Sequence, residues 1–261
     1  MTISVVTGGA GFIGSHIVDL LLLEGHEVRV IDNLSGGHKR NLEYHKSNPK
    51  LNFYNIDINN ISSNSEIFTD CNYCFHLAGI GDIVPSIQRP LDYFKTNILG
   101  TINVLEAARY SGVTKFIYAS SSSCYGLADT PTTESHLISP MHPYAMSKYQ
   151  GEQAVFHWNN VYGMSANSIC IFNAYGPRVR TTGAYGAVFG VFFKQKLANK
   201  PFTIVGNGEQ KRDFVYVTDV ASAFLAAAYS DTNAQRYNIG NADPKSINSL
   251  VALLGKNEVV Y

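Results

Sequence analysis

The stretch Thr7-Gly8-Gly9-Ala10-Gly11-Phe12-Ile13-Gly14 decides the fold, because it joins an apolar β-rich run to a segment with helical spacing. Glycines at positions 8, 11 and 14 permit a tight turn, close approach of the backbone to a pyrophosphate, and close packing of helix on strand. The first amides and the dipole of the helix stabilise a diphosphate. A glycine-rich turn is common in proteins, but this one has the strand–turn–helix context that dinucleotide binding requires.

The next β-rich run ends in Asp32, eighteen residues after Gly14. An acid at this position accepts hydrogen bonds from the adenosine ribose hydroxyls and repels a 2′-phosphate, so it favours NAD over NADP. Asp57 follows the third run and is placed to flank the adenine, together with Ile58. The alternative interpretation of Asp32 is a solvated carboxylate at a strand end.

Short β-rich runs alternate with longer stretches of helical spacing through most of the chain. The predicted strands cover residues 3–7, 28–32, 51–54, 73–77, 115–120 and 168–172, and the predicted helices cover 12–24, 91–110 and 144–162. This alternation indicates βαβ units and a parallel sheet. We therefore predict a doubly wound, Rossmann-like α/β fold.

After about residue 172 the elements become shorter and are separated by glycine-containing turns. Helical spacing recurs at 184–197, 220–229 and 247–254. We predict an NAD-binding domain over 1–172 and a smaller α/β substrate lobe over 173–261, with part of the chain returning to the first domain. The chain ends at Tyr261 within what reads as another strand, so we expect this lobe to be incomplete.

The composition excludes several classes of protein. Apolar residues make up 45% of the 261 residues and charged residues 15%, which excludes intrinsic disorder. Lys+Arg and Asp+Glu balance at 20 each, so the chain lacks the basic field that nucleic acid requires. No apolar run approaches the roughly 18–20 residues of a spanning helix, and we recognise no signal peptide. We expect a cytoplasmic globular protein without nucleic-acid or membrane partners.

Four cysteines in a chain of this length do not predict a disulfide framework. Cys71 and Cys74 have the spacing of a zinc or redox pair, but no complete set of four ligands lies nearby. We therefore expect no metal site.

Tyr144 and Lys148 form a Tyr-x-x-x-Lys pair in the predicted helix 144–162 and share one helical face. A free tyrosine titrates near 10 and is a poor base at neutral pH. A nearby ammonium favours the phenolate, as does the positive charge of a nicotinamide. Lowering the pKa by about three units requires roughly 4 kcal/mol. Such pairs also arise by chance, and 16 tyrosines provide many opportunities.

The serine run from Ser120 to Ser123 follows the fifth predicted strand at its C-terminal end. Ligands of open α/β sheets bind at that edge. A hydroxyl there is placed to bridge a substrate oxygen and Tyr144, although the composition of the run also fits an ordinary turn.

The three motifs occur together and in order. With the glycine turn, Ser121, Tyr144 and Lys148, the chain resembles the extended short-chain dehydrogenase/reductase family, and within it the NAD-dependent nucleotide-sugar epimerases and dehydratases of the UDP-glucose 4-epimerase type. Further similar stretches are HLAG at 76–79, NILGTINV at 97–104, FNAYGPR at 172–178 and RDFVYV at 212–217. The resemblance extends from residue 2 to about residue 255.

The resemblance implies roles for individual residues. Tyr144 is implied as the base, Lys148 as the residue that holds the nicotinamide ribose and lowers the tyrosine's pKa, and Ser121 as the residue that assists at the reacting oxygen. The implied contacts of NAD are Gly8, Gly11, Phe12, Ile13, Gly14, Asp32, Asn33, Asp57, Ile58, Leu77, Ala78, Asn97, Tyr144 and Lys148. The implied contacts of the nucleotide sugar are Ser86, Ser121, Ser122, Ser123, Asn173 and Arg212.

The residues after Ser121 help to choose among the reactions of the family. The 4,6-dehydratases carry an Asp-Glu pair at this place, whose acid protonates the leaving hydroxyl. Here the pair is Ser122 and Ser123, so we expect 4-epimerisation of a UDP-hexose through a transient 4-keto sugar. A nucleotide-sugar decarboxylase, a 4,6-dehydratase and a catalytically silent NAD-binding regulator remain open.

The chain departs from the family pattern in two ways. Cys170 stands where many members have an arginine, and most members continue for several dozen residues with groups that complete the substrate pocket. The apolar residues of 91–110 and 144–162 match helices that pair in the family, so a homodimer is expected by analogy.

Overall fold

The computed structural model describes residues 1–180, 188–255 and 257–261. At its centre lies a sheet of seven parallel strands in the order β3-β2-β1-β4-β5-β6-β11. The strands are β1 (Ile3–Thr7), β2 (Glu27–Ile31), β3 (Leu51–Tyr54), β4 (Tyr73–His76), β5 (Lys115–Ser121), β6 (Ala166–Ile171) and β11 (Gln235–Ile239). The predicted doubly wound fold is confirmed, and the six strands predicted from the sequence are observed with bounds that differ by at most two residues.

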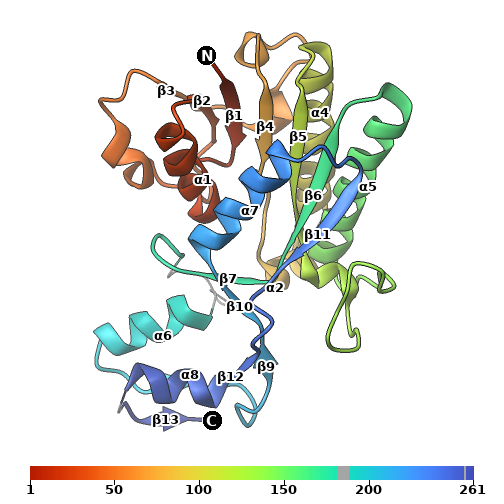
Figure 1. Cartoon of the computed structure of the whole chain (residues 1–261). Coiled ribbons are helices and arrows are strands. Elements are labelled where there is room, and N and C mark those ends of the chain that lie inside the picture. The colour runs from red at the N-terminus through yellow and green to blue at the C-terminus, as the bar shows by residue number, and fades with distance from the viewer. Residues whose placement is uncertain (181–187, 256) are drawn as a thin grey trace.

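Helices cover both faces of this sheet (Figure 1). The helices α1 (Phe12–Leu23) and α7 (Val217–Tyr229) pack together on one face, and α4 (Thr101–Tyr110) and α5 (Pro143–Tyr162) cover the other. Val5 and Val6 of β1 belong to two different apolar cores, one under each helical layer. Because both faces are covered, the central strands are apolar at consecutive positions.

The predicted helix 91–110 is divided into three segments. They are α3 (Pro90–Phe94), a π-helical turn η4 (Lys95–Gly100) and α4. A Cβ on Gly100 would lie 2.6 Å from Cδ1 of Ile58, so any larger residue here would require the Ile58 side chain to move. Single π-turns inside helices are frequent at functional sites, and this one carries Asn97.

Short helices occupy the connections between the main elements. The 3₁₀ segments are η1 (Lys39–His45), η2 (Ile58–Asn60), η3 (Glu66–Phe68) and η5 (Ser122–Tyr125), and α2 (Ile83–Gln88) follows β4. In the described part of the chain, no helix has both the length and the apolar character needed to cross a bilayer.

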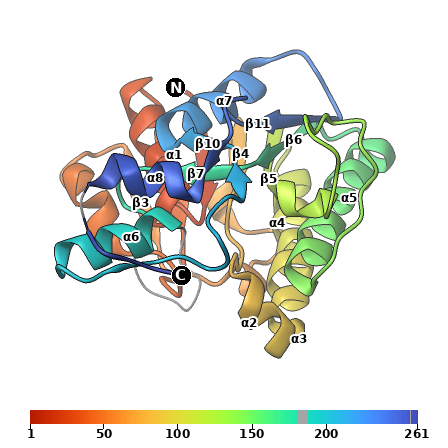
Figure 2. The same ribbon diagram turned by 90° about the horizontal axis from the view of Figure 1, so that it is seen from below.

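A smaller layer lies beyond the carboxyl ends of the strands, at the bottom of Figure 1 and towards the viewer in Figure 2. Its helices are α6 (Val188–Leu197) and α8 (Ile247–Leu254), around a core of Phe192, Phe202, Ile204, Phe214, Ile247, Leu250 and Val251. Its strand pairs are β7 (Asn173–Tyr175) with β10 (Phe214–Tyr216), β8 (Phe202–Thr203) with β13 (Val259–Val260), and β9 (Lys211–Arg212) with β12 (Lys245–Ser246). The predicted helix 184–197 is observed from Val188, and its residues 184–187 lie outside the described residues, as does the predicted turn at 181–183.

The chain leaves the sheet after β6 and returns to it later. Helix α7 packs against α1, and β11 extends the sheet beside β6. The domain boundary at residue 172 stays a prediction.

Candidate active site

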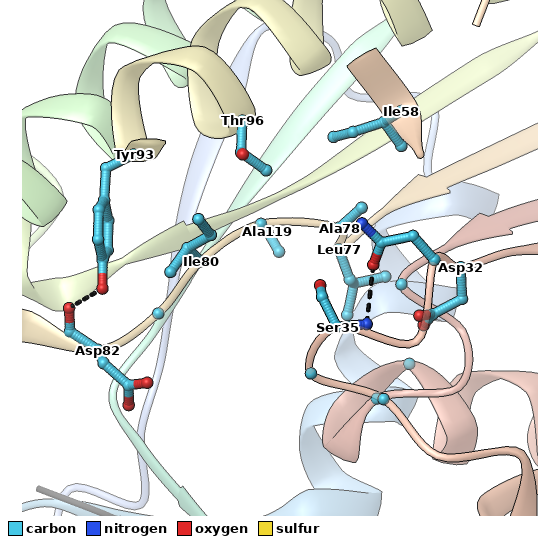
Figure 3. Close-up of a pocket in the computed structure, with 18 of the residues that line it drawn as sticks. Asp32, Ser35, Ile58, Leu77, Ala78, Ile80, Asp82, Tyr93, Thr96 and Ala119 are labelled. Carbon is cyan, nitrogen blue, oxygen red and sulfur yellow. Dashed lines mark hydrogen bonds between the residues drawn. The ribbon is translucent and has the colours of Figure 1, made fainter. Parts of the chain in front are cut away.

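A cavity of about 730 Å³ opens at the carboxyl ends of the central strands. Figure 3 shows Asp32 and Ser35 at one end of it and Asp82 and Tyr93 at the other. The cavity adjoins the turns after β1 and β4, which are neighbours in the sheet although β2 and β3 lie on the other side of β1. The strand order reverses at this point, and open α/β sheets bind their ligands there.

The glycine turn forms the wall of the cavity between β1 and α1. Gly8 has a φ of +69°, and a Cβ at this position would lie 2.7 Å from the backbone nitrogen of Ala78. A Cβ on Gly14 would lie 2.2 Å from the carbonyl oxygen of Gly8. Gly11 is the N-cap residue of α1, and no side chain caps the helix there. The first amides of α1 are therefore left for an anionic ligand, as phosphate-binding helices require.

Carboxylates line the end of the cavity next to β2. Asp32 accepts hydrogen bonds from the backbone N–H groups of Ala10 at 3.0 Å and Leu34 at 2.8 Å, which fix its orientation. Asp57 accepts hydrogen bonds from the side-chain amide of Asn33 and the backbone of Asn59. Burial acts to raise the pKa of Asp57, but these hydrogen bonds outweigh it and lower the pKa overall. The arrangement suits the hydroxyls and base of an adenosine.

At the other end, Tyr144 projects from the start of α5. Pro143 occupies the first turn, where its fixed φ favours helix initiation, and His142 caps the helix by accepting the N–H of Ala145 at 3.2 Å. The phenol ring stacks on His142 with centroids 5.9 Å apart and meets Tyr93 edge-on at 6.4 Å. These contacts fix the direction of the Tyr144 side chain.

The protonation of Tyr144 in the protein alone differs from the expectation. Burial raises the pKa of Tyr144 to about 12, a side-chain hydrogen bond with Ser121 opposes the rise, and the charges of Cys124, Cys170 and Asp82 add to it. The lowering of this pKa that we expected from Lys148 is not seen among the described groups. Desolvation of the phenol is the largest cause, although part of the Tyr144 side chain stays exposed at the cavity wall.

Lys148 lies one turn further along α5, at the cavity wall. Its ammonium sits 4.4 Å from the centre of the Tyr118 ring. Burial lowers the pKa of Lys148 to about 8, against the opposing charges of Cys124 and Glu152. A group that titrates so close to neutral pH, inside a cavity, is typical of functional sites.

The structure brings most of the predicted cofactor contacts together. The cavity is lined by Gly8, Gly11, Phe12, Ile13, Gly14, Asp32, Asn33, Asp57, Ile58, Leu77, Ala78, Tyr144 and Lys148. Asn97 is buried behind the wall: its amide accepts the N–H of Ile80 and donates to the Ile80 carbonyl and to Ser147. Asn97 can therefore affect a ligand only indirectly, by fixing the loop that contains Ile80.

The predicted substrate contacts lie outside this lining, as far as the described residues go. Ser121 ends β5 and caps η5 by accepting the N–H of Ser123, while Ser122 starts that helix. Ser86 is buried and donates to the carbonyl of Ile83. In the smaller layer, Asn173 donates to the carbonyl of Asp213, and the exposed Arg212 donates to the carbonyl of Lys211.

Asp82, Tyr93 and Arg180 are among the cavity residues that were not predicted from the sequence. Asp82 pairs with Arg180 at 3.5 Å, and its backbone carbonyl accepts the Tyr93 hydroxyl at 2.6 Å. The Arg180 guanidinium also lies 3.8 Å from the position of a Cβ on Gly36, so it connects opposite walls of the cavity. The one available signal was that Arg180 lies two residues beyond the family-like stretch 172–178.

The switch-point cavity, the uncapped glycine turn and the acid after β2 define a Rossmann-type dinucleotide-binding protein. The residues present fit NAD, because a Cβ would fill the glycine cradle and Asp32 stands where ribose hydroxyls are recognised. The chain belongs to the NAD-dependent epimerase/dehydratase family, whose model matches residues 4–240. NAD is accordingly its cofactor.

Relatives from other organisms support this assignment. A Methanocaldococcus jannaschii protein provisionally named a UDP-glucose 4-epimerase is 39% identical over 98% of this chain and 82% of its own length. The UDP-N-acetylglucosamine 4-epimerase of Methanobrevibacter ruminantium, solved with UDP-N-acetylmuramic acid, superimposes with a TM-score of 0.94 at 34% identity, over 99% of this chain and 84% of that one. The UDP-glucose 4-epimerase of Thermotoga maritima, solved with UDP-glucose, gives 0.91 at 36% identity, over 99% and 85%.

Proposed function

We propose that this protein interconverts UDP-hexoses at C4 through a transient 4-keto sugar. The observation that carries the proposal is the placement of Tyr144: it lines the cavity together with Lys148, one helical turn further along α5, and its ring meets Tyr93 edge-on at the end of the cavity opposite Asp32. The relatives described above are named for UDP-sugar 4-epimerisation, which supports the same reaction here.

In this mechanism the glycine turn and Asp32 hold NAD, which supplies a reversible acceptor for the hydride at C4. Tyr144 takes the proton of the 4-hydroxyl as base, and Ser121 donates a hydrogen bond at the same oxygen. After the keto sugar turns over in the cavity, Tyr144 returns the proton to the oxygen at C4. The reaction has no net proton transfer, because the proton that Tyr144 removes from the 4-hydroxyl in the first half is returned to the same oxygen in the second.

Tyr144 needs a source of positive charge to act as a base. With its pKa at about 12 in the protein alone, ionisation near pH 8 requires a lowering by about four units, or about 5 kcal/mol. The charged Lys148 and an oxidised nicotinamide are the cations that this site would place beside the phenol. Tyr144 is therefore expected to become basic only when the cofactor is bound.

The serines after Ser121 favour epimerisation over elimination. A 4,6-dehydratase needs a group that protonates the leaving hydroxyl, and a serine hydroxyl does not act as an acid near neutral pH. Ser122 and Ser123 also lie in η5 and do not belong to the described cavity lining.

We further propose that two copies of the chain pair through the layer formed by α3, η4, α4 and α5. This surface carries large apolar side chains that are exposed in one copy: Leu91, Leu99, Tyr110, Val161 and Tyr162. Exposed apolar side chains gathered on neighbouring helices are typical of an interface between subunits.

The test is to incubate the purified protein with UDP-glucose, UDP-galactose, UDP-N-acetylglucosamine and UDP-glucuronic acid, and to analyse products by NMR and mass spectrometry. We expect one of them to give a product of unchanged mass with inverted C4. In Tyr144→Phe, turnover should fall by about a hundredfold or more while NAD stays bound, since one general base is lost. Gly14→Ala is the matched variant that loses NAD as well.

Four results contradict the proposal. A product that has lost carbon dioxide indicates a decarboxylase, and one that has lost water indicates a dehydratase. The absence of any conversion by NAD-loaded protein indicates a silent NAD-binding regulator. Unchanged turnover in Tyr144→Phe would show that the base is another residue.

A further inference from the structure

A buried ion pair lies behind the catalytic helix α5. Glu152 has a side chain with 0% exposure, and Arg236 one with 14%. The Arg236 Nε donates to both carboxylate oxygens, at 3.1 and 3.2 Å, and its Nη2 donates to Oε2. The Ser168 hydroxyl adds a hydrogen bond to Oε1 at 2.6 Å. Such a carboxylate is held in one place by charge-assisted bonds.

The arginine of this pair comes from the far end of the chain. Arg236 lies on β11 directly beside Ser168 of β6, and the next pair on the same face is Asn238 with Cys170. Arg236 therefore lies two residues along the strand from the residue opposite Cys170, and its charge opposes the rise in pKa that burial imposes on the Cys170 thiol. The charge expected at position 170 from the family resemblance is thus supplied by the neighbouring strand.

The pair is close to Lys148. Glu152 follows Lys148 by four residues on α5, so the two side chains share one face of the helix. The negative charge of Glu152 raises the pKa of Lys148, against the effect of burial. Glu152 therefore acts on the ammonium that lies at the cavity wall.

The other described groups that interact with Lys148 are uncharged at pH 8. From β4, burial lowers the pKa of His76 to about 3. From η5, burial raises the pKa of Cys124 to about 11, and on α5 it raises that of Tyr144 to about 12. From β5, burial raises the pKa of Tyr118 far above its ordinary value. Of the two described groups whose negative charge would raise the pKa of Lys148, Cys124 is protonated at pH 8, so Glu152 is the anion that remains.

We propose that Glu152 is a positioning residue that keeps Lys148 protonated, and that Arg236 holds the Glu152 carboxylate in place. This inference rests on the proposed function in one respect: the proposed reaction requires a charged lysine beside Tyr144. If the Glu152 carboxylate is removed, the buried Lys148 ammonium loses a negative charge that stabilises it, and the pKa of Lys148 falls.

The direct test is to follow the titration of Lys148 by NMR with ¹³C in the lysine side chains, assigning its signal by its loss in Lys148→Arg. All proteins are used as purified, with matched NAD content. Glu152→Gln should move the midpoint down by about one pH unit, a tenfold fall in the ratio of charged to neutral lysine at pH 8. Glu27→Gln is the control, because Glu27 also pairs with an arginine, Arg29 at 2.9 Å, but lies on β2. Its Lys148 midpoint should match the wild type.

Two further variants provide a result even if Glu152→Gln does not fold. Glu152→Gln leaves a partly buried cation unpaired and is liable to fold poorly, so Glu152→Gln is also combined with Arg236→Gln. The folded double variant should still show a lowered Lys148 midpoint, whereas the single variant Arg236→Lys, which keeps both the Glu152 carboxylate and a cation beside it, should keep the wild-type midpoint. An unchanged midpoint in a folded variant that lacks the carboxylate overturns the inference.

Kinetics separates this inference from the proposed function. In the epimerase assay, the alkaline limb of the kcat/KM profile should move with the Lys148 midpoint, and a merely structural defect lowers the rate at every pH. A shifted midpoint in a protein that converts no UDP-hexose refutes the proposed function and leaves the inference standing.

Discussion

At the scale of single residues, His76 of β4 connects β1 to α4. Its Nδ1 accepts the Thr7 hydroxyl at 2.7 Å, and its Nε2–H donates to the Thr101 hydroxyl at 2.9 Å. We assign this tautomer because Thr101 already donates to the carbonyl of Asn97. The Thr7 hydroxyl in turn accepts the N–H of Ala78, which lines the cavity. A second proton on His76 would break this chain.

The charge of His76 therefore couples stability to pH. Burial lowers the pKa of His76 to about 3, and Lys148 adds to the effect. Between pH 6.5 and 3 the unfolded state binds a proton that the folded state excludes, so stability falls as the pH falls, by up to about 1.4 kcal/mol per unit. Urea unfolding of wild type and His76→Gln at pH 7, 6 and 5 measures this. The advantage of wild type should shrink with that slope, and an advantage independent of pH would contradict the assignment.

At the scale of elements, the fit of α5 on β5 depends on one glycine. The Tyr118 hydroxyl donates to the backbone carbonyl of Lys148 at 3.1 Å. A Cβ on Gly151 would lie 2.3 Å from this hydroxyl oxygen and 2.8 Å from the carbonyl oxygen of Asn97. The helix therefore approaches the strand and the π-turn through a position where no side chain fits, and this approach brings Lys148 to the cavity.

Gly151→Ala should destabilise the protein even though alanine is the better helix former. The gain in helix propensity of about 1 kcal/mol is outweighed by overpacking, and we expect a net loss of about 1–3 kcal/mol in the free energy of unfolding. Gly81→Ala is the matched control, because a Cβ there meets nothing within 4 Å, and it should stay within about 0.5 kcal/mol. Equal stability of the two variants would disprove the close approach.

At the scale of the whole molecule, the cavity lies at the carboxyl ends of the sheet strands, the side on which the smaller layer lies. The segment that leaves β7 is attached to the sheet layer by Arg178, which pairs with Asp19 of α1 at 2.7 Å, and by Arg180, which pairs with Asp82. The chain then returns through α7 and β11, which delivers Arg236 to α5. The position of α5 therefore depends in part on a strand that the chain adds to the sheet only after it has formed most of the smaller layer.

The proposed dimer is also a property of the whole molecule. Light scattering should give twice the chain mass of 28.6 kDa for wild type. Leu99→Glu places a charge in the proposed interface and should give the monomer mass. Leu23→Glu, at an exposed position of α1 on the opposite face of the sheet, should remain dimeric. A monomeric wild type, or a dimeric Leu99→Glu, would exclude this interface.

The sequence by itself determined the doubly wound fold, the glycine turn, Asp32 and the Tyr144–Lys148 pair. Each of these follows from local information: residue periodicity, a turn that only glycine permits, and two side chains one helical turn apart. The same local rules predicted the helix 91–110 but not its π-turn, where Gly100 lies against Ile58, a residue distant in the sequence.

Only the tertiary structure decided which distant residues complete the site. Glu152 and Arg236 are 84 residues apart, and Asp82 and Arg180 are 98 apart. Strand order and register bring the first pair together, and the path of the chain after β7 brings the second. The raised pKa of Tyr144 has the same origin, since desolvation depends on what packs around the phenol and not on its neighbours in the chain.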